Sequence, residues 1–562
     1  MTDIRRSILW MIFAFSLILL WDRWQIHNGR NALFFPSPAA TQVVAEGGGT
    51  TGDAASVAVP SASGALTPSG TVPVTEVAES RAAAQTVEVT TDVYRLRFSS
   101  EGGSLVRAEL LDYENNQRNG NVVLLDQADG RTYVAQTGLI GGAFPNHQST
   151  MELVEGPRSL TEGQDTLTVQ FRSPEADGVQ LVKTWTLRRG SYDMQVGHQV
   201  INRSGAPVTP QLYMQIVRDG EEIKGGVMFT GTYTGPAIYS DEQKFEKVKF
   251  EDISKGKADF QAQSSTGYVA MVQHYFASAW IPPEGANREN FARKLGSDLY
   301  SVGSITAFPT IAPGQSEQLQ VSFYTGPQIE KQLEGITPGL ELVKDYGMIK
   351  VLAKPLYWLL DRLHDLIGNW GWAIVALVLV LKIAFYWLNA KAYGSMAKMK
   401  AINPRIMQLR ERLKDNPQQM QMEMMKIYRE EKVNPLGGCL PILIQMPFFI
   451  ALYWVLLSSV EMRHAPWMLW IQDLSIPDPF FILPLLMTVS SLLQVALNPV
   501  PPDPLQAKMM WFMPLIFSVM FFFFPAGLVL YWLTNNILSI AQQWIINVRM
   551  GVPPQFNLPK FK

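Results

Sequence analysis

The sequence has one cysteine, few histidines and almost no net charge. Because Cys439 is the only cysteine, the chain cannot form an internal disulfide. The six histidines are scattered, with no two at the spacing of metal ligands, so we expect neither a metal nor another cofactor. A formal net charge of −2 provides no overall attraction for nucleic acid, and DNA is therefore not an expected partner.

The first 35 residues contain an apolar run, Ile8 to Trp21, preceded by two arginines. A run of this length also suits a cleavable signal peptide. However, no small-residue cleavage site follows it, and the flanking tryptophans are typical of a membrane interface. We therefore predict an uncleaved transmembrane anchor over residues 1–35. Residues 36–85 are poor in large apolar side chains, which predicts a disordered tether.

Residues 86–335 show the alternation of apolar and polar side chains that is typical of strands. Tyr94, Leu96 and Phe98 are separated by arginines, and similar runs recur between Gly, Asn and Asp turns. This density of short strands predicts a large antiparallel β-sandwich. His198 falls on the apolar side of its run, so we interpret it as a core side chain rather than a catalytic one. The region has no nucleophile motif, and we expect no enzymatic activity.

Residues 343–368 have the pattern of an amphipathic helix, because apolar residues recur at spacings of three, four and seven with charged residues between them. This pattern favours a helix in the plane of the membrane interface, and packing on the sandwich is the alternative. The apolar runs that follow predict a transmembrane helix over 369–389 and four more over 436–548. With the N-terminal anchor, the membrane α-helical bundle has six spans, of which five form the core.

Basic residues set the expected orientation in the membrane. The segment Leu388–Pro435 carries ten Lys and Arg against five acids, whereas Glu461–Pro479 carries one Arg against three acids. By the positive-inside rule, the first segment is cytoplasmic and the second lies outside. An even number of spans then places both termini, including the tail over 549–562, in the cytoplasm. The sandwich becomes a periplasmic domain on the bacterial inner membrane.

Lys382 lies near the centre of the apolar run Ala373–Leu388, which contains no acid. A lysine at mid-bilayer costs on the order of 2.5–3.5 kcal/mol. We therefore interpret it as the cation of a water-filled groove that attracts an acidic or polar segment of a passing chain. The alternative is that Lys382 snorkels to the cytoplasmic interface. The other spans offer only neutral polar groups, and the proposed groove residues among them are Gln445, Gln494, Asn535 and Asn536.

Residues 390–435 are predicted to form a cytoplasmic helical hairpin. An apolar stripe from Ile402 to Leu413 has helical spacing, and Asn416-Pro417 then supplies an N-cap and a proline at the first position of a second helix. The methionines suit an adaptable partner surface or, for Met407, Met420 and Met424, the hairpin core. The basic residues suit anionic lipid and ribosomal RNA equally, and they are Lys398, Lys400, Arg405, Arg410, Arg412 and Lys414.

Seven stretches carry distinctive residue combinations, and they are Gly368–Trp372, Ser395–Met399, Glu431–Cys439, Gln445–Pro447, Asp478–Pro479, Phe524–Tyr531 and Val269–Phe276. These stretches resemble the YidC family of membrane protein insertases, in its long Gram-negative form within the Oxa-type superfamily. The resemblance implies an insertase and chaperone for nascent membrane proteins, which works alone or with the Sec translocon. It also implies that the five C-terminal spans form a positively charged groove.

The resemblance further implies an apolar slide along the third and fifth spans for the client's apolar helix, and the slide residues here are Met520, Phe521, Tyr531 and Trp532. Many members carry arginine where Lys382 stands and tyrosine where Trp532 stands. The short, weakly basic tail leaves the cytoplasmic hairpin as the expected ribosome contact. A secondary transporter or channel with Lys382 as the substrate's counter-charge is the alternative function, although such proteins normally show internal repeats and an intramembrane acid.

Overall fold

The structure, a computed structural model, describes residues 85–128, 130–220, 233–413, 416–431, 440–498, 504–551 and 556. The predicted anchor lies outside the described residues, and so do the tether, except Gln85, and most of the tail. The chain divides into two compact units. Among the described residues, the β-unit runs from 85 to 345 and the helical unit from 346 onward.

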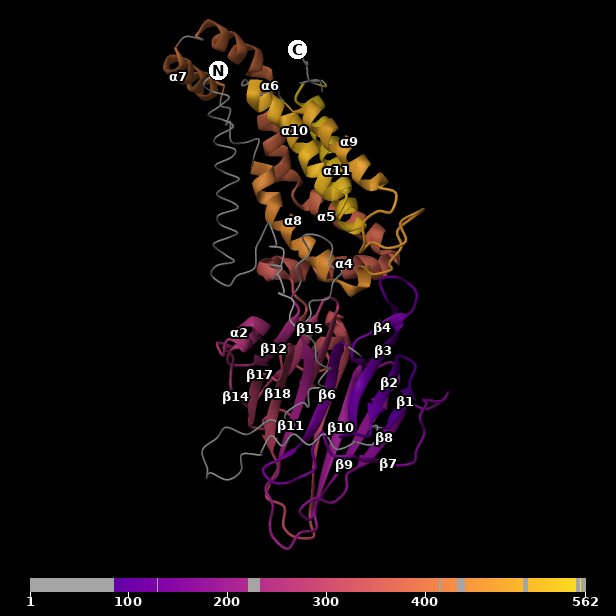
Figure 1. Ribbon diagram of the computed structural model, residues 1–562. Helices are drawn as coiled ribbons and strands as arrows, with labels where there is room; N and C mark the ends of the chain where they lie inside the picture. The colour runs from indigo at the N-terminus through magenta and orange to yellow at the C-terminus, as the bar shows by residue number, and fades with distance from the viewer. Residues whose placement is uncertain are drawn as a thin grey trace, which may run out of the picture. The chain divides into compact units, whose positions relative to one another are not determined.

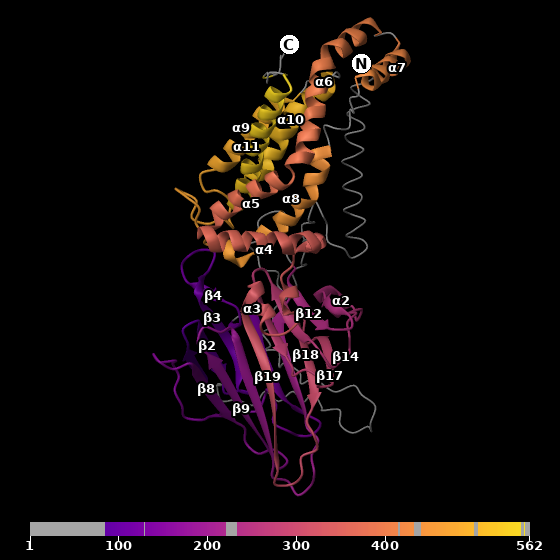
Figure 2. The same cartoon turned by 180° about the vertical axis from the view of Figure 1, so that it is seen from behind.

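The β-unit consists of two antiparallel sheets (Figures 1 and 2). One sheet has the order β1-β2-β3-β6-β11-β18-β17-β14, with β4 beside β3 and β5 beside β6. The other has the order β13-β12-β15-β16-β19-β10-β9-β8-β7. The ladders between neighbouring strands are antiparallel. The antiparallel sandwich predicted from the alternating pattern is therefore confirmed.

The strands of the first sheet are β1 (Thr86–Thr90), β2 (Tyr94–Ser99), β3 (Ser104–Glu114), β4 (Asn121–Val123), β5 (Asp126–Ala128), β6 (Arg131–Ile140), β11 (Gln211–Asp219), β14 (Gln263–Ser264), β17 (Arg288–Lys294) and β18 (Leu299–Ala307). Those of the second are β7 (Glu152–Leu153), β8 (Thr166–Arg172), β9 (Val179–Arg188), β10 (Asp193–Asn202), β12 (Gly235–Ser240), β13 (Lys244–Lys247), β15 (Tyr268–Gln273), β16 (Phe276–Ile281) and β19 (Ser316–Pro327). Short helical turns in this unit are α2 (Phe250–Ser254), α3 (Glu330–Glu334) and η1 (Leu340–Val343).

Large aromatic side chains fill the space between the two sheets. Trp185 of β9 and Trp280 of β16 are buried with ring centroids 6.0 Å apart, and Phe323 packs on Trp280 at 4.4 Å. Each indole N–H donates across the sandwich, from Trp185 to Gly103 O at 3.2 Å and from Trp280 to Gln215 O at 3.0 Å. Burial of these rings therefore costs no hydrogen bond, because the opposite sheet supplies the acceptors.

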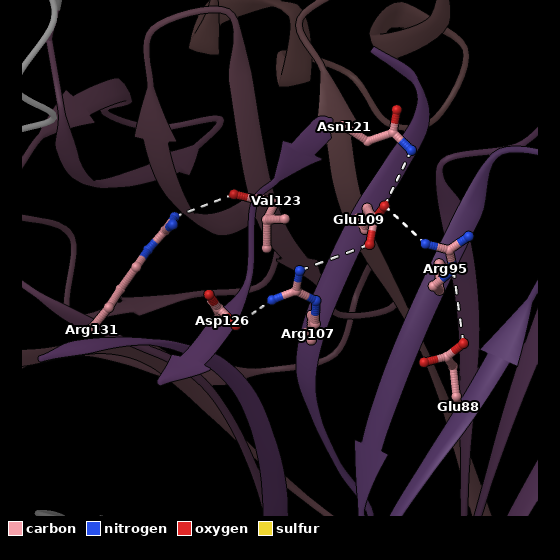
Figure 3. A network of polar contacts seen from close by, with 8 residues as sticks. All are labelled: Glu88, Arg95, Arg107, Glu109, Asn121, Val123, Asp126 and Arg131. Atoms are coloured by element: carbon pink, nitrogen blue, oxygen red, sulfur yellow. Dashed lines mark hydrogen bonds and ion pairs between the residues drawn. The ribbon is translucent and has the colours of Figure 1, made fainter. Parts of the chain in front are cut away.

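The outer face of β2 and β3 carries a ladder of charged side chains (Figure 3). Glu109 accepts from Arg95 at 3.1 Å and from Asn121 at 3.1 Å, and it lies 3.8 Å from Arg107. Arg107 in turn donates to Asp126 at 2.9 Å. Such cross-strand pairs stabilise a solvated sheet face by a few tenths of a kcal/mol to about 1 kcal/mol each. This face is therefore held by charge pairing, whereas the inner face is held by apolar packing.

The helices of the helical unit are η2 (Gly347–Ile349), α4 (Lys350–Ile367), α5 (Trp370–Ala384), α6 (Tyr386–Arg412), α7 (Pro417–Glu430), α8 (Leu440–Ser458), η4 (Val460–Met462), α9 (Ile482–Leu497), α10 (Pro504–Phe521) and α11 (Ala526–Arg549). In both ribbon views α4 runs across the group formed by the later helices, at one end of it (Figures 1 and 2). Its buried face, with Leu356 and Leu360, belongs to one core that also contains Leu377, Val455 and Val529.

The turn between α4 and α5 follows directly from the residues Gly368 and Asn369. Gly368 ends α4 in the left-handed region at φ 74°, where a side chain would be strained. The Asn369 side chain then caps α5 by accepting from Trp372 N at 3.0 Å. Its amide group also donates to the carbonyls of Pro466 and Trp467. The turn therefore fixes the angle between the two helices and ties them to the 461–479 loop.

The predicted transmembrane helix over 369–389 is interrupted in the structure. Its helix α5 ends at Ala384, and α6 continues with a bend of 70°. No proline lies at the bend; Phe385 leaves the helical region at φ −93°, ψ 11°, and its ring packs on Phe448 at 5.0 Å. Lys382 therefore lies in the last turn of α5 rather than near the centre of a continuous helix. This is a correction to the sequence-based placement.

Among the described helices, none is alone both long and apolar enough to meet a simple length-and-hydropathy criterion for a membrane span. The bent pair α5 and α6 meets that criterion jointly.

The two helices of the predicted hairpin, α6 and α7, pack on each other through a small apolar core. Ile402, Ile406 and Leu409 face Ile427 and Tyr428. The N-cap lies where the sequence predicts it, since the Asn416 side chain accepts from Gln419 N at 3.2 Å and Pro417 begins α7.

Of the three methionines considered for the hairpin core, Met424 packs against it. Met407 is 50% exposed, so its assignment to the core is wrong. The reason is geometric: Met407 follows Ile406 by one residue and is turned about 100° away from the apolar stripe.

Candidate functional site

Lys382 is buried between α5 and α11. Its side chain is only 8% exposed, and its ammonium group donates to Ser539 Oγ at 2.7 Å. Among the residues that the structure describes, no carboxylate lies within ion-pair distance of it. An amine held this way by a neighbouring helix does not extend toward solvent as a snorkelling lysine would. The geometry therefore favours an internal cation over the snorkelling alternative.

A small recess lies beside this ammonium group. Its volume is about 30 Å³, enough for roughly one water molecule. The side chains around it come from the end of α5, the start of α6, α8 and α11, and they are Val378, Leu381, Lys382, Phe385, Asn389, Gln445, Phe448, Tyr531 and Asn535. A cation, three amide side chains and one phenol thus meet an apolar wall, a mixture that suits a hydrated polar group at the edge of an apolar core.

One hydrogen bond links α8 to α11 at the recess. The Gln445 amide donates to Asn535 Oδ1 at 2.5 Å. Together with the bond from Lys382 to Ser539, it satisfies polar groups of three helices within a largely apolar bundle. Hydrogen bonds of this kind hold helices together where water is scarce. Polar bonds between helices therefore lie at the recess and beside it.

The structure brings three of the five predicted groove residues together: Lys382, Gln445 and Asn535 line the recess. Asn536 points elsewhere, because its amide donates to Ser490 and Ser491 of α9 at 3.2 and 2.9 Å. Gln494 is half-buried in α9 and is not among the residues around the recess. Ser539, which the sequence analysis did not single out, is the direct partner of the cation. Its position four residues after Asn535 is the signal that could have identified it.

The four predicted slide residues lie in one aromatic cluster. Phe521 packs on Trp532 at 5.3 Å, and Phe449 of α8 packs on Trp532 at 4.4 Å and on Tyr531 at 6.1 Å. Phe521 and Tyr531 are buried, and Met520 packs on the same core. Phe449 was not predicted as a member. Helix α10 also exposes apolar side chains, and these include Phe512, Leu515, Ile516, Phe517 and Val519.

The basic side chains of the hairpin differ in how they are held. Arg405 pairs within the hairpin, with Glu430 at 3.3 Å and Glu431 at 3.2 Å. Lys398 and Arg412 are exposed, and Lys400 and Arg410 are half-buried. Lys414 lies outside the described residues. Part of the hairpin's positive charge is thus neutralised internally, and Lys398 and Arg412 present charge to the surroundings.

Two protein families match the chain in sequence. Residues 86–359 match the family described as "YidC periplasmic domain", and residues 362–552 match "60Kd inner membrane protein". The chain is 51% identical over 552 residues to the "Membrane protein insertase YidC" of Ralstonia nicotianae and 52% identical over 549 residues to that of Cupriavidus metallidurans. Each alignment covers 98% of both chains. Among solved structures, "Active YidC insertase crystal structure with the first transmembrane domain resolved" is 18% identical with a TM-score of 0.37, covering 82% of this chain and 92% of that one.

Proposed function

The chain belongs to the YidC family of membrane protein insertases, and from that premise we propose that it guides client proteins into the bilayer through a polar site centred on Lys382. Membrane protein insertion is not an enzymatic activity, and the family resides in the bacterial inner membrane. Nascent membrane proteins are accordingly its clients.

The observation that carries the proposal is the environment of Lys382. Lys382 is 8% exposed and its described hydrogen-bond partner is a serine hydroxyl, so no described carboxylate neutralises the charge of its ammonium form. Such a charge favours an acidic or strongly polar segment of a client over an apolar one. An insertase needs this property, because the hydrophilic part of a client must leave water before it can cross.

Client binding at this site requires the helices to separate. The recess of about 30 Å³ holds roughly one water molecule and cannot hold a peptide segment. We propose that a client's polar groups replace the bond between Gln445 and Asn535 and the bond between Lys382 and Ser539, so that the closed arrangement exchanges one set of hydrogen bonds for another. Exchange of this kind costs little net free energy, because no buried polar group is left unpaired.

The aromatic cluster of Phe449, Phe521, Tyr531 and Trp532 is the proposed contact for the client's apolar helix, with Met520 beside it. It lies next to the recess through Tyr531, which belongs to both. A client that places its polar segment at Lys382 would then place its apolar segment against these rings. The two halves of a client therefore meet matching surfaces.

We also propose the topology expected from the sequence: six spans, cytoplasmic termini, a periplasmic domain over 86–335 and an interfacial helix over 343–368. The charge asymmetry between Leu388–Pro435 and Glu461–Pro479 supports it. The hairpin over 390–435 would then lie in the cytoplasm, where its exposed basic side chains suit the ribosome or anionic lipid. Cooperation with the Sec translocon belongs to the same proposal. The alternative of a transporter gains no support from the family.

Reconstituted vesicles that insert a small client with an acidic translocated segment test the proposal. We expect Lys382→Ala to reduce insertion about tenfold, since a hydrogen bond to a charged group contributes about 1.5–3 kcal/mol. Lys382→Arg keeps the charge and should retain most activity. Lys391→Ala is the matched control, because Lys391 is exposed and lies over the Trp387 ring at 3.7 Å instead of at the recess. Equal insertion by the two alanine variants would contradict the role given to Lys382.

A further inference from the structure

A stripe of polar side chains runs along one face of α11. Asn535, Ser539 and Gln542 follow each other at spacings of four and three residues, which places them above one another on a helix. Gln445 of α8 bonds to the first of them, and Lys382 of α5 bonds to the second. Gln542 is the third position of the stripe, one turn closer to the C-terminal end of α11.

The third position of the stripe is a buried amide. The Gln542 side chain is only 8% exposed, and neither its amide nitrogen nor its amide oxygen forms a hydrogen bond within the described part of the chain. A buried primary amide with both groups unpaired is destabilising, and native proteins rarely leave one in that state. In a bundle surrounded by lipid, bulk water does not replace the missing bonds. Something outside the described residues must therefore satisfy Gln542.

The next residue shows what a structural glutamine looks like on the same helix. Gln543 is 2% exposed, and its amide donates to Asn498 Oδ1 at the end of α9, at 3.1 Å, although its oxygen has no described partner. It lies seven residues after Asn536, which also bonds to α9. The stripe of Asn536 and Gln543 therefore joins α11 to α9. The stripe of Asn535, Ser539 and Gln542 contacts the recess and ends in an amide that has no hydrogen-bond partner among the described residues.

We propose that Gln542 hydrogen-bonds the peptide backbone of a client's hydrophilic segment while that segment occupies the site at Lys382. The proposal rests on the proposed function and adds a second kind of contact to it. A primary amide offers one donor group and one acceptor, which is the complement of a peptide group. Every client has peptide groups, whereas only some have acids. Lys382 would then favour acidic segments, and Gln542 would hold any polar segment without regard to its sequence.

Leucine substitution separates this role from a structural one. Gln542→Leu removes two unpaired buried polar groups at similar volume, so the full-length protein in vesicles should be at least as heat-stable as the parent. Its insertion of a client with a long neutral polar segment should nevertheless fall about threefold to tenfold, as expected for a lost hydrogen bond. Gln543→Leu is the control: breaking the bond to Asn498 should lower the melting temperature. If Gln542→Leu lowers the melting temperature as Gln543→Leu does, or leaves insertion unchanged, the proposal is wrong.

Photo-crosslinking separates failure of this inference from failure of the proposed function. A benzophenone amino acid is placed at 542, at 543 or at Phe385, an aromatic position that lines the recess, and a stalled client is presented to each variant. We expect the client's polar segment to crosslink to 385 and to 542, with at least fivefold less product at 543. Crosslinking at 385 without 542 would overturn the role of Gln542 alone. Absence of client at both positions would overturn the polar site itself.

Discussion

Lys183 provides a pH-dependent test of the β-unit. This lysine of β9 is fully buried, and its ammonium group donates to the carbonyls of Gly102 at 2.5 Å and Thr137 at 3.2 Å. No carboxylate pairs with it among the residues that the structure describes. Burial alone lowers the pKa of Lys183 to about 7. Its cross-strand partner His198 is buried as well, and burial together with Lys183 holds the pKa of that imidazole well below its usual value.

The sign of the effect follows from the two pKa values. The unfolded chain has a lysine pKa near 10.5 and the folded unit about 7, so the unfolded state binds more protons between these values. Stability should therefore rise with pH across this window, by at most about 1.4 kcal/mol per pH unit. Between pH 7.5 and 9.5 the gain in stability from Lys183 should be about 2 kcal/mol. His198 stays neutral in this range and adds no slope.

Urea unfolding of a fragment over 85–345, followed by fluorescence of the buried Trp185 and Trp280, measures this gain. The comparison is with Lys183→Met, which cannot titrate. In the variant two carbonyl groups have no donor, which should lower the free energy of unfolding by about 1–3 kcal/mol at every pH. The parent's stability should therefore rise relative to the variant's by about 2 kcal/mol from pH 7.5 to 9.5. If the stabilities of the two proteins change with pH in parallel, Lys183 does not have the lowered pKa.

Two further predictions concern stability. Glu109→Gln weakens the charge pairing with Arg95 and Arg107, so urea unfolding should show a loss of stability of about 1 kcal/mol. This loss should become smaller at high salt, and a loss independent of salt would contradict an electrostatic origin. Asn369→Ala removes the cap of α5 and the bonds to the 461–479 loop. Thermal unfolding of the full-length protein should therefore show a loss of stability of about 1–2 kcal/mol. An unchanged melting temperature would show that the cap does not stabilise the protein.

The sandwich could be predicted from the sequence because the alternation of apolar and polar residues directly indicates which side chains are buried. In β2 the buried residues are Tyr94, Leu96 and Phe98, and the exposed ones are the arginines between them. The bend after α5 could not be predicted in this way. No proline or glycine marks it, and Phe385 leaves the helix where its ring packs on Phe448, a contact made across 63 residues of sequence. The pattern of a single segment does not contain such a contact.

The candidate site, too, could be predicted from the sequence only in part. Lys382 and Gln445 could be selected because a charge or an amide within an apolar run is conspicuous. Asn535 and Asn536 could not be told apart, since adjacent residues on a helix point about 100° from each other and only the neighbouring helices decide which one faces the recess. Ser539 was missed because a serine in a membrane helix commonly bonds to its own backbone, as this one also does to Asn535 O.

A charge-reversal experiment tests most directly whether the cation at 382 receives the client's polar segment. Two clients that differ only in carrying aspartates or lysines in the translocated segment are inserted by the parent protein and by Lys382→Glu, in the same vesicles. Because each protein serves as its own reference, a general loss of activity does not affect the comparison. We expect that the parent prefers the aspartate client and that Lys382→Glu prefers the lysine client. The same preference in both proteins would contradict it.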